Sequence, residues 1–423
     1  MGNGANTFKE LQNSRKEMSY LEYYRPKRKQ MSLQSAAVFF IGLYILMLFL
    51  FEDSKQYFMI ANLVFAGMVA ISLFTLRNLQ FDLLRTEKFL IAYMCLTGVS
   101  VLWAWDIKAT ISDTTRQILF FIMWYSIVSI LRRDERFIKI VLKWIMLAGC
   151  VLTGYLLLHY GVGAFIASIF SSVRIGEDIV QLNKLGMYAA TVIIIAVNFF
   201  LHTRKVSYIG VILINFIAMA GSSSKRAYLM VVLCIVISVL FSIHSRNALN
   251  RFFKVIVWLC ILGIAGYYLL RMEVFSGIAN RFLELFDTVD NRRNDFSRTR
   301  FLMYGWESFK QNPILGIGSG NSHKVTLQAM GWATYLHNNY LEQAVNLGII
   351  GLTIYYGIYI SLLRSYIPKL KEHNMISNTI IVLLISQLIS DIAATSYNVK
   401  FTYVLFALAI AYLKREKDIA IRE

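Results

Sequence analysis

Charged residues are scarce in this sequence, and their scarcity excludes most soluble folds. Only 16% of the 423 residues are Asp, Glu, Lys or Arg, whereas soluble domains carry about 25%. Hydrophobic residues make up 57%, and the mean hydropathy is +0.54. Apolar runs of membrane-spanning length recur along the whole chain. The sequence therefore predicts an all-α, polytopic membrane protein.

Proline and cysteine are also rare, and each absence narrows the possibilities. With three prolines, few helices should be sharply kinked by proline. The four cysteines lie within apolar runs, and none has metal-ligand spacing to another; they are Cys95, Cys150, Cys234 and Cys260. We expect them to be small helix residues rather than disulfides or a metal site. No metal and no cofactor is expected.

The net charge of +18 does not indicate nucleic-acid binding. Most basic residues lie at the two ends and in short segments between apolar runs, as the positive-inside bias requires. Residues 1–33 are polar and basic, and the first apolar run begins late, so no cleavable signal peptide is expected. Both ends of the chain should lie in the cytoplasm.

When the basic loops are all placed on the cytoplasmic side of the membrane, the sequence predicts about twelve spans. One long polar segment, on the outer face, interrupts them and should be helical in part. The predicted regions are a basic arm at 1–33, nine spans within 34–270, an outer catalytic loop at 271–343, three spans within 344–413 and a tail at 414–423. Residues 106–117 and the stretch between the last two spans are expected to be outer loops.

Some cations lie on the outer side, against the bias, and need a reason. Lys225 and Arg226 stand together where two apolar runs meet, and Arg298 and Arg300 lie in the long segment. Arginine binds phosphate oxygens bidentately, so these residues, with Arg174 of another outer loop, are candidates for holding a diphosphate. The remaining arginines of the long segment are expected to be solvated or paired with acidic neighbours; they are Arg271, Arg281, Arg292 and Arg293.

Several short phrases occur in a fixed order on the predicted outer face. In chain order they are QLNKLG at 181–186, GSSSKRA at 221–227, RFLMY at 300–304, NPILGIGSGN at 312–321, HNNYL at 337–341 and LGIIGL at 347–352. The ordered set resembles the signature of the O-antigen ligase and O-antigen polymerase superfamily, over about residues 174–355. Either Lys225 or Arg226 could occupy the basic position of the family. Gly316, Gly318 and Gly320 are expected to form a tight turn, not a nucleotide loop.

The resemblance implies a metal-independent, inverting membrane glycosyltransferase of the GT-C class, in the bacterial cytoplasmic membrane, with its active site on the outer face. The donor would be a glycan on undecaprenyl diphosphate. The acceptor would be a sugar hydroxyl on a second lipid-linked repeat unit for a polymerase, which we favour, or on lipid A–core for a ligase. The polymer would be O-antigen, capsule or exopolysaccharide. A chain-length regulator would be a further partner of a polymerase.

His337 is the candidate general base, because a sugar hydroxyl is weakly acidic and imidazole titrates near neutral pH. The alternative is a histidine that orients the entry to the next helix or only binds the acceptor. The diphosphate would be held by Arg300, Lys225 or Arg226, Arg298 and Arg174. Asn338, Asn183 and Tyr304 are candidates for substrate binding or for a structural role.

Two other functions remain open from the sequence. A transporter or flippase would also have about twelve spans with both ends inside, but would more often carry charges in mid-helix; Asp391 is the exception here. A metal-dependent glycosyltransferase would use acidic residues at outer span ends. Glu52, Asp53 and Asp106 are placed for that role, without a convincing set of partner ligands.

Overall fold

The computed structural model describes residues 28–52, 58–75, 83–171, 176, 179–242, 257 and 292–420. Every regular element in these ranges is a helix, so the expected all-α class is confirmed for them. In chain order the helices are α2 (Arg28–Phe51), α3 (Phe58–Thr75), α4 (Arg85–Val99), η2 (Ser100–Leu102), α5 (Ile107–Leu131), α6 (Glu135–Tyr160), α7 (Val162–Ser171), α8 (Leu182–Thr203), α9 (Ser207–Ser222), α10 (Lys225–Ser242), α13 (Arg292–Gln311), α14 (Ser322–Met330), α15 (Asn339–Tyr366), η4 (Ile367–Glu372), α16 (Met375–Asp391) and α17 (Lys400–Ala420).

Six of the described helical segments are long and apolar enough to cross a membrane. They are Leu33–Phe51, Ile107–Leu131, Glu135–Tyr160, Leu182–Thr203, Lys225–Ser242 and Asn339–Glu372. Shorter apolar helices occur at Met59–Leu73, Ser207–Ser222 and Met375–Asp391. The last of the nine spans predicted within 34–270, at about 255–270, lies outside the described residues apart from Val257. The count of about twelve spans therefore stays a prediction.

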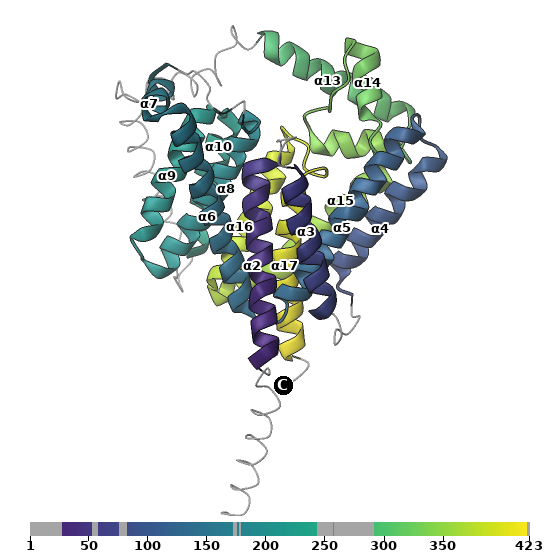
Figure 1. Cartoon of the computed structure of the whole chain (residues 1–423). Coiled ribbons are helices and arrows are strands. Elements are labelled where there is room, and N and C mark those ends of the chain that lie inside the picture. Colours follow the sequence, from purple (N-terminus) through teal and green to yellow (C-terminus); the bar gives the residue numbers. More distant parts are fainter. Residues whose placement is uncertain are drawn as a thin grey trace, which may run out of the picture.

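The described helices form one bundle with two flanks (Figure 1). Helices α2, α3 and α17 stand near its middle, α6, α8, α9 and α10 lie on one flank, and α4, α5 and α15 lie on the other. Helix α16 packs against α8 and α10, and α17 packs against α5. Helices α13 and α14, from the predicted outer segment, lie across one end and contact α15. The buried side chains along these contacts are mostly aliphatic and aromatic.

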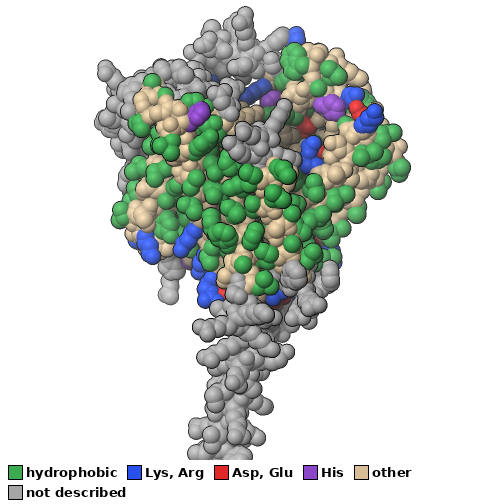
Figure 2. Space-filling view, viewed as in Figure 1, with side chains coloured by type: hydrophobic (Ala, Val, Ile, Leu, Met, Phe, Trp, Pro, Cys, Tyr) green, Lys and Arg blue, Asp and Glu red, His purple; other side chains and the backbone are tan. Residues whose placement is uncertain are grey.

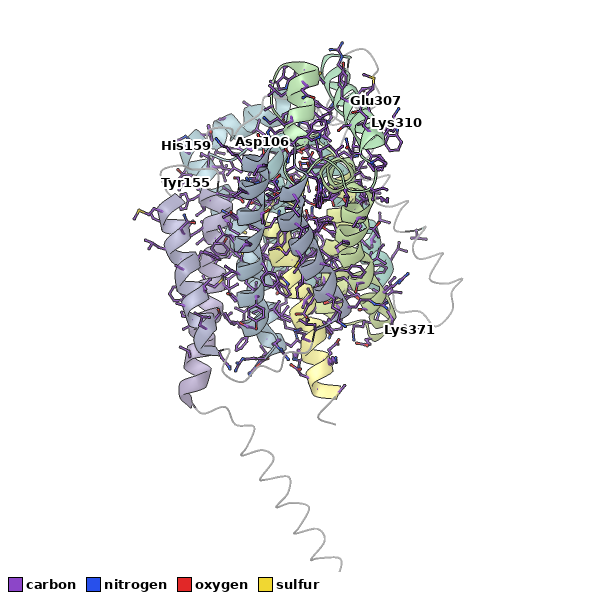
Figure 3. All side chains as sticks on the ribbon, turned by 90° about the vertical axis from the view of Figure 1, so that its right-hand side faces the viewer. Asp106, Tyr155, His159, Glu307, Lys310 and Lys371 are labelled. Atoms are coloured by element: carbon purple, nitrogen blue, oxygen red, sulfur yellow. The ribbon has the colours of Figure 1, made fainter. Side chains whose placement is uncertain are left out.

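The two ends of the bundle carry different polar groups. Figure 3 places Lys371 at one end and Asp106, His159, Glu307 and Lys310 toward the other. Figure 2 shows hydrophobic side chains over much of the side surface between them. Ion pairs of the predicted inner loops join Arg132 to Asp418 at 2.8 Å and Lys414 to Glu87 at 2.7 Å. An apolar belt between two polar ends is the arrangement that a bilayer requires.

The expected loop at 106–117 is wrong, because these residues form the first turns of α5. Asp106 is the N-cap, and its Oδ1 accepts a hydrogen bond from Ala109 N at 3.1 Å. Thr110, Asp113 and Gln117 follow at helical spacing, and all three are buried. The stretch looked like a loop because its polar residues interrupt the hydropathy. They face the protein interior instead, where other loops supply their partners.

The turn expected around Gly316 is confirmed, and it packs against a break in α15. Gly316 has φ 68° and Gly348 has φ 64°, both in the left-handed region. A Cβ on Gly348 would lie 2.1 Å from the carbonyl oxygen of Ile314. Backbone bonds join Ile317 N to the carbonyl of Val345 at 3.0 Å and Gly318 N to that of Asn346 at 2.9 Å. These bonds fix the outer segment on the helix that follows the motif histidine.

Candidate active site

A polar pocket of about 830 Å³ lies where α8, α10 and α15 begin. Figure 2 shows Lys, Arg and His side chains gathered in a hollow at this end. A helix N-terminus carries a partial positive charge, so three such termini favour an anionic ligand. The polar residues that line the pocket are Gln181, Asn183, Lys184, Tyr188, Thr191, Ser224, Lys225, Arg226, Arg298, Tyr335, His337, Glu342, Gln387, Ser390, Thr395, Ser396, Tyr397 and Asn398.

Two segments supply three of the predicted cations. Lys225 and Arg226 are the first residues of α10, and Arg298 comes from α13. Nη1 of Arg226 donates to the carbonyl oxygen of Ala393 at 2.8 Å. Its Nε is buried and has no hydrogen-bond partner among the described residues. A buried, unpaired donor on a charged group is costly unless a ligand accepts from it, so the guanidinium is suited to binding an anion.

His337 lies in the same pocket, two residues before α15 begins. Its φ of 56° places it in the left-handed region, and its ring lies 4.1 Å from the ring of Tyr335 and 5.7 Å from that of Phe301, centroid to centroid. Burial, followed by the charges of Arg298 and Arg226, lowers the pKa of His337 to about 4. The imidazole is therefore neutral at pH 7 and can accept a proton.

The two asparagines after His337 support the protein around it. Asn338 is the N-cap of α15, since its Oδ1 accepts from Leu341 N at 2.9 Å. Its Nδ2 donates to the carbonyl of Ile392 at 3.1 Å. These bonds favour the structural role over the substrate-binding role for Asn338. They place the first turn of α15 at Asn339, inside the predicted outer segment 271–343.

A buried carboxylate below the pocket was not predicted as a site residue. Asp391, at the end of α16, accepts from Asn339 Nδ2 at 3.2 Å, Tyr356 Oη at 2.9 Å and Gln387 Nε2 at 3.2 Å. Asn339 Oδ1 in turn accepts from the backbone N of Ser396 at 3.1 Å. The stretch 392–399, expected to be only a short outer turn, thereby becomes a wall of the pocket. The one sequence signal was an acidic residue inside an apolar run.

The other predicted residues are placed as follows. Asn183, in the first turn of α8, lines the pocket. Arg300 and Tyr304, on α13, are partly buried but do not line it; Tyr304 packs on a small cluster around Phe301. Arg174 lies outside the described residues. Arg298 thus reaches the pocket, while Arg300, two residues later, does not.

The acidic residues considered as metal ligands are engaged by cations. Glu52 Oε2 lies 3.2 Å from Lys184 Nζ and accepts from Tyr188 Oη at 2.6 Å. Asp106 Oδ2 lies 2.9 Å from Lys324 Nζ, and this hydrogen bond is the main cause that lowers the pKa of Asp106. Asp53 lies outside the described residues. Within the described ranges, no group of three or more His, Cys, Asp or Glu side chains is arranged to hold a metal ion.

The comparison with known families agrees with the motifs. Residues 179–356 match a family model described as O-antigen ligase. The matched segment includes α8, α10, α13 and the start of α15, which together carry Asn183, Arg226, Arg298 and His337. No curated protein gives a significant match to the chain.

Proposed function

Because residues 179–356 match a family model described as O-antigen ligase, we propose that the protein is a polysaccharide polymerase. It transfers a glycan from undecaprenyl diphosphate to a sugar hydroxyl of another lipid-linked repeat unit. The observation that carries the proposal is the meeting of Arg226, Arg298 and His337 in one pocket. A cation pair beside a neutral imidazole suits a reaction in which a diphosphate leaves and a hydroxyl loses its proton.

The leaving diphosphate is the charged partner of this site. As the bond from the anomeric carbon to the diphosphate oxygen breaks, negative charge develops on that oxygen. Preorganised donors stabilise such charge strongly where water is excluded. The unpaired Nε of Arg226 is fixed in direction by the bond of Nη1 to Ala393, and Arg298 and Lys225 add positive potential. Arg300, which does not line the pocket, would act on the donor only from outside this group. Arg174, outside the described residues, stays a candidate for the diphosphate.

His337 takes the proton of the acceptor hydroxyl as that oxygen forms the new bond to the anomeric carbon. Attack from the face opposite the diphosphate inverts the configuration. The arginines that lower the pKa of His337 would be neutralised in part by the bound diphosphate. Donor binding should therefore raise the basicity of His337 and so couple binding of the diphosphate to deprotonation of the acceptor hydroxyl. No step requires a metal ion.

The proposed setting is the bacterial cytoplasmic membrane. The pocket belongs to the outer face, both termini to the cytoplasm, and the segment 271–343 is the catalytic loop between spans 34–270 and 344–413. Two features support this orientation: the predicted inner loops hold the basic clusters, and α13 and α14 cap the end of the bundle that holds the pocket.

Reconstitution tests this proposal against its alternatives. The full-length protein in nanodiscs is incubated with undecaprenyl-diphosphate-linked repeat units from its host, with and without EDTA. A ladder of longer glycans, with release of undecaprenyl diphosphate in EDTA, is expected. Transfer only to added lipid A–core would identify a ligase. Flux of lipid-linked units across liposomes without any new glycosidic bond would identify a transporter instead.

A further inference from the structure

A second, smaller cavity adjoins the candidate active site. Its volume is about 280 Å³, and it lies between the first turns of α5, the segment 320–323 and the loop 392–399. Tyr335, Glu342, Tyr397 and Asn398 line both this cavity and the larger pocket. A ligand in the second cavity would therefore contact residues that also line the candidate active site. The volume is near the lower limit of ligand pockets, about 300 Å³, which suits one sugar ring.

The two cavities differ in charge. The described lining of the large pocket contains Lys184, Lys225, Arg226 and Arg298 but a single carboxylate, Glu342. The second cavity has Asp113 and Glu342 with one guanidinium, from Arg116. Two acidic groups beside one guanidinium suit a diphosphate less well than the four cations of the large pocket do. The second cavity is therefore suited to a neutral polar ligand rather than to the charged end of the donor.

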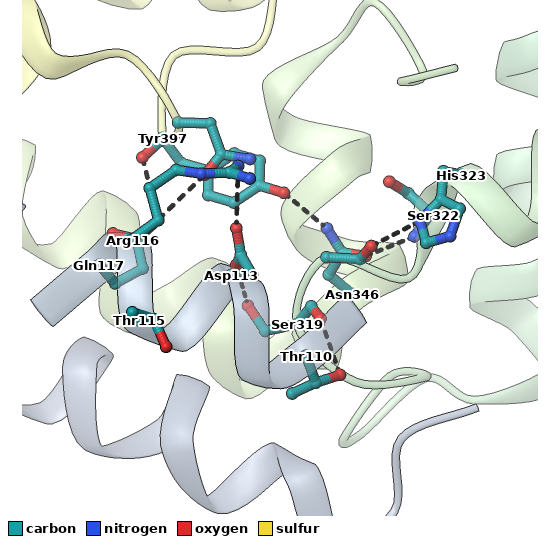
Figure 4. A network of polar contacts seen from close by, with 12 residues as sticks. Thr110, Asp113, Thr115, Arg116, Gln117, Ser319, Ser322, His323, Asn346 and Tyr397 are labelled. Atoms are coloured by element: carbon teal, nitrogen blue, oxygen red, sulfur yellow. Dashed lines mark hydrogen bonds and ion pairs between the residues drawn. The ribbon is translucent and has the colours of Figure 1, made fainter. Parts of the chain in front are cut away.

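Hydrogen bonds hold the acidic groups of the second cavity in place, and Figure 4 shows those of Asp113. Asp113 Oδ2 accepts from Ser319 Oγ at 2.6 Å, and its Oδ1 lies 3.4 Å from Arg116 Nη1. Glu342 accepts from Ser322 Oγ and from Leu336 N. Each oxygen of a carboxyl group can accept more than one hydrogen bond, so these contacts fix each group and leave capacity for hydroxyl donors.

The rest of the lining adds further groups that bind hydroxyls. Nδ1 of His323 lies 2.7 Å from the carbonyl oxygen of Gly320, so when Nδ1 donates to it, Nε2 is an acceptor. Ser112 and Asn398 also line the cavity. Tyr335 completes the path toward the reaction centre, because its ring lies 4.1 Å from that of His337 and its side chain lines both cavities.

From this arrangement we propose that the second cavity binds a neutral sugar of the acceptor glycan and directs its reacting hydroxyl past Tyr335 to His337. The inference rests on the proposed function, since it assigns the acceptor side of that reaction. The donor and acceptor then occupy separate, adjoining cavities that differ in charge. Such separation lets the enzyme hold two glycans with similar sugars in different orientations.

Ser112 offers a way to fill the cavity without disturbing its hydrogen bonds. It is exposed, lines the second cavity, and lies on the first turns of α5. Thr115, three residues later, is also exposed but does not line the cavity, and Figure 4 shows it pointing away from the network. Ser112→Trp and Thr115→Trp are therefore a matched pair of equal bulk on one helix.

Two ligands separate the two sides of the site. Binding of the repeat-unit oligosaccharide, released from the host's own polysaccharide, is followed by saturation-transfer NMR on the full-length protein in nanodiscs. Binding of undecaprenyl diphosphate is followed by native mass spectrometry. Ser112→Trp should weaken oligosaccharide binding about tenfold or more, which corresponds to about 1.4 kcal/mol, and leave diphosphate binding unchanged. Thr115→Trp should change neither.

Several results would overturn the inference. These are oligosaccharide binding that Ser112→Trp leaves unchanged, equal weakening by the two tryptophan variants, or no binding by the wild type. If Ser112→Trp does not accumulate as a folded protein, His323→Ala replaces it, with the same expected loss and the same interpretation of unchanged binding. Oligosaccharide binding that depends on Ser112, in a protein that transfers no glycan, would support the sugar site and contradict the proposed function.

Discussion

Nη1 of Arg226 donates a hydrogen bond of 2.8 Å to the carbonyl oxygen of Ala393. This bond joins the start of α10 to the loop between α16 and α17, two segments 167 residues apart. It orients the guanidinium so that a second N–H, on Nε, stays buried and finds no partner within the part of the chain that the structure describes. The bond thus fixes the guanidinium of Arg226 relative to the loop that forms this wall of the pocket.

Arg226→Lys should impair transfer even though it keeps the charge. An ammonium group cannot donate to Ala393 and to a phosphate oxygen in the same planar geometry. Losing one charge-assisted hydrogen bond, worth about 1.5–3 kcal/mol, should lower kcat/KM roughly 10- to 100-fold. The measurement is glycan transfer by protein in nanodiscs. Arg364→Lys, on the exposed far part of α15, is the control, and equal losses in both variants would contradict the role of Arg226.

His337→Asn should abolish transfer while the protein stays folded. Asparagine adopts the left-handed conformation that position 337 requires, so the fold is kept and the imidazole is lost. Removal of a general base typically costs about 10²–10⁴-fold in rate. Affinity for undecaprenyl diphosphate, measured separately, should change little. His159→Ala, at the exposed end of α6, should be as active as wild type. Wild-type turnover by His337→Asn would show that another group takes the proton.

The pH profile should reveal the charge that surrounds His337. The base acts in its neutral form, so kcat/KM should fall only as the pH drops toward the free-enzyme pKa of about 4. Arg298 disfavours the imidazolium, so Arg298→Gln should raise this pKa and move the acid limb to higher pH. Profiles of kcat/KM between pH 4 and 8 measure the shift. An acid limb that stays in place or moves down would refute the coupling.

Asp391→Asn should loosen the contact between α15 and α16 beside the pocket. The carboxylate accepts from Asn339, Tyr356 and Gln387, and an amide would turn an NH₂ group toward one of these donors. Leaving a buried polar group unsatisfied costs about 1–3 kcal/mol, so the melting temperature in detergent should fall and transfer should weaken. Glu307→Gln alters only an exposed pair with Lys310 and should leave the melting temperature nearly unchanged; a similar drop in both variants would argue against a special role for Asp391.

Gly348→Ala should destabilise the protein more than an ordinary glycine substitution. The new Cβ would meet the carbonyl oxygen of Ile314 at 2.1 Å, at a left-handed φ of 64°. Such backbone strain costs of order 1–3 kcal/mol. Thermal unfolding of Gly348→Ala and Gly210→Ala should differ in direction. A Cβ at Gly210 meets nothing within 4 Å, and alanine is the better helix former. A stable Gly348→Ala would mean that the turn can move away from α15.

The sequence by itself determined that this is a helical membrane protein, and it identified candidate functional residues. Hydropathy and the scarcity of charge are properties of single segments and identify apolar helices, while the positions of the basic loops predict the side of the membrane. The motif order, also a property of short segments, identified His337, Arg300 and the pair Lys225–Arg226 as candidates. The glycine turn was also predicted, because a positive φ is a local requirement.

Only the tertiary structure decided which of these residues meet. The inward face of α5, the role of Asp391 and the wall formed by 392–399 depend on packing between segments far apart in the chain. Packing also decides that Arg298 rather than Arg300 lines the pocket, because residues two apart on a helix point to different sides of it. Local patterns carry no information on such contacts, because the energy that selects them arises only when the helices pack.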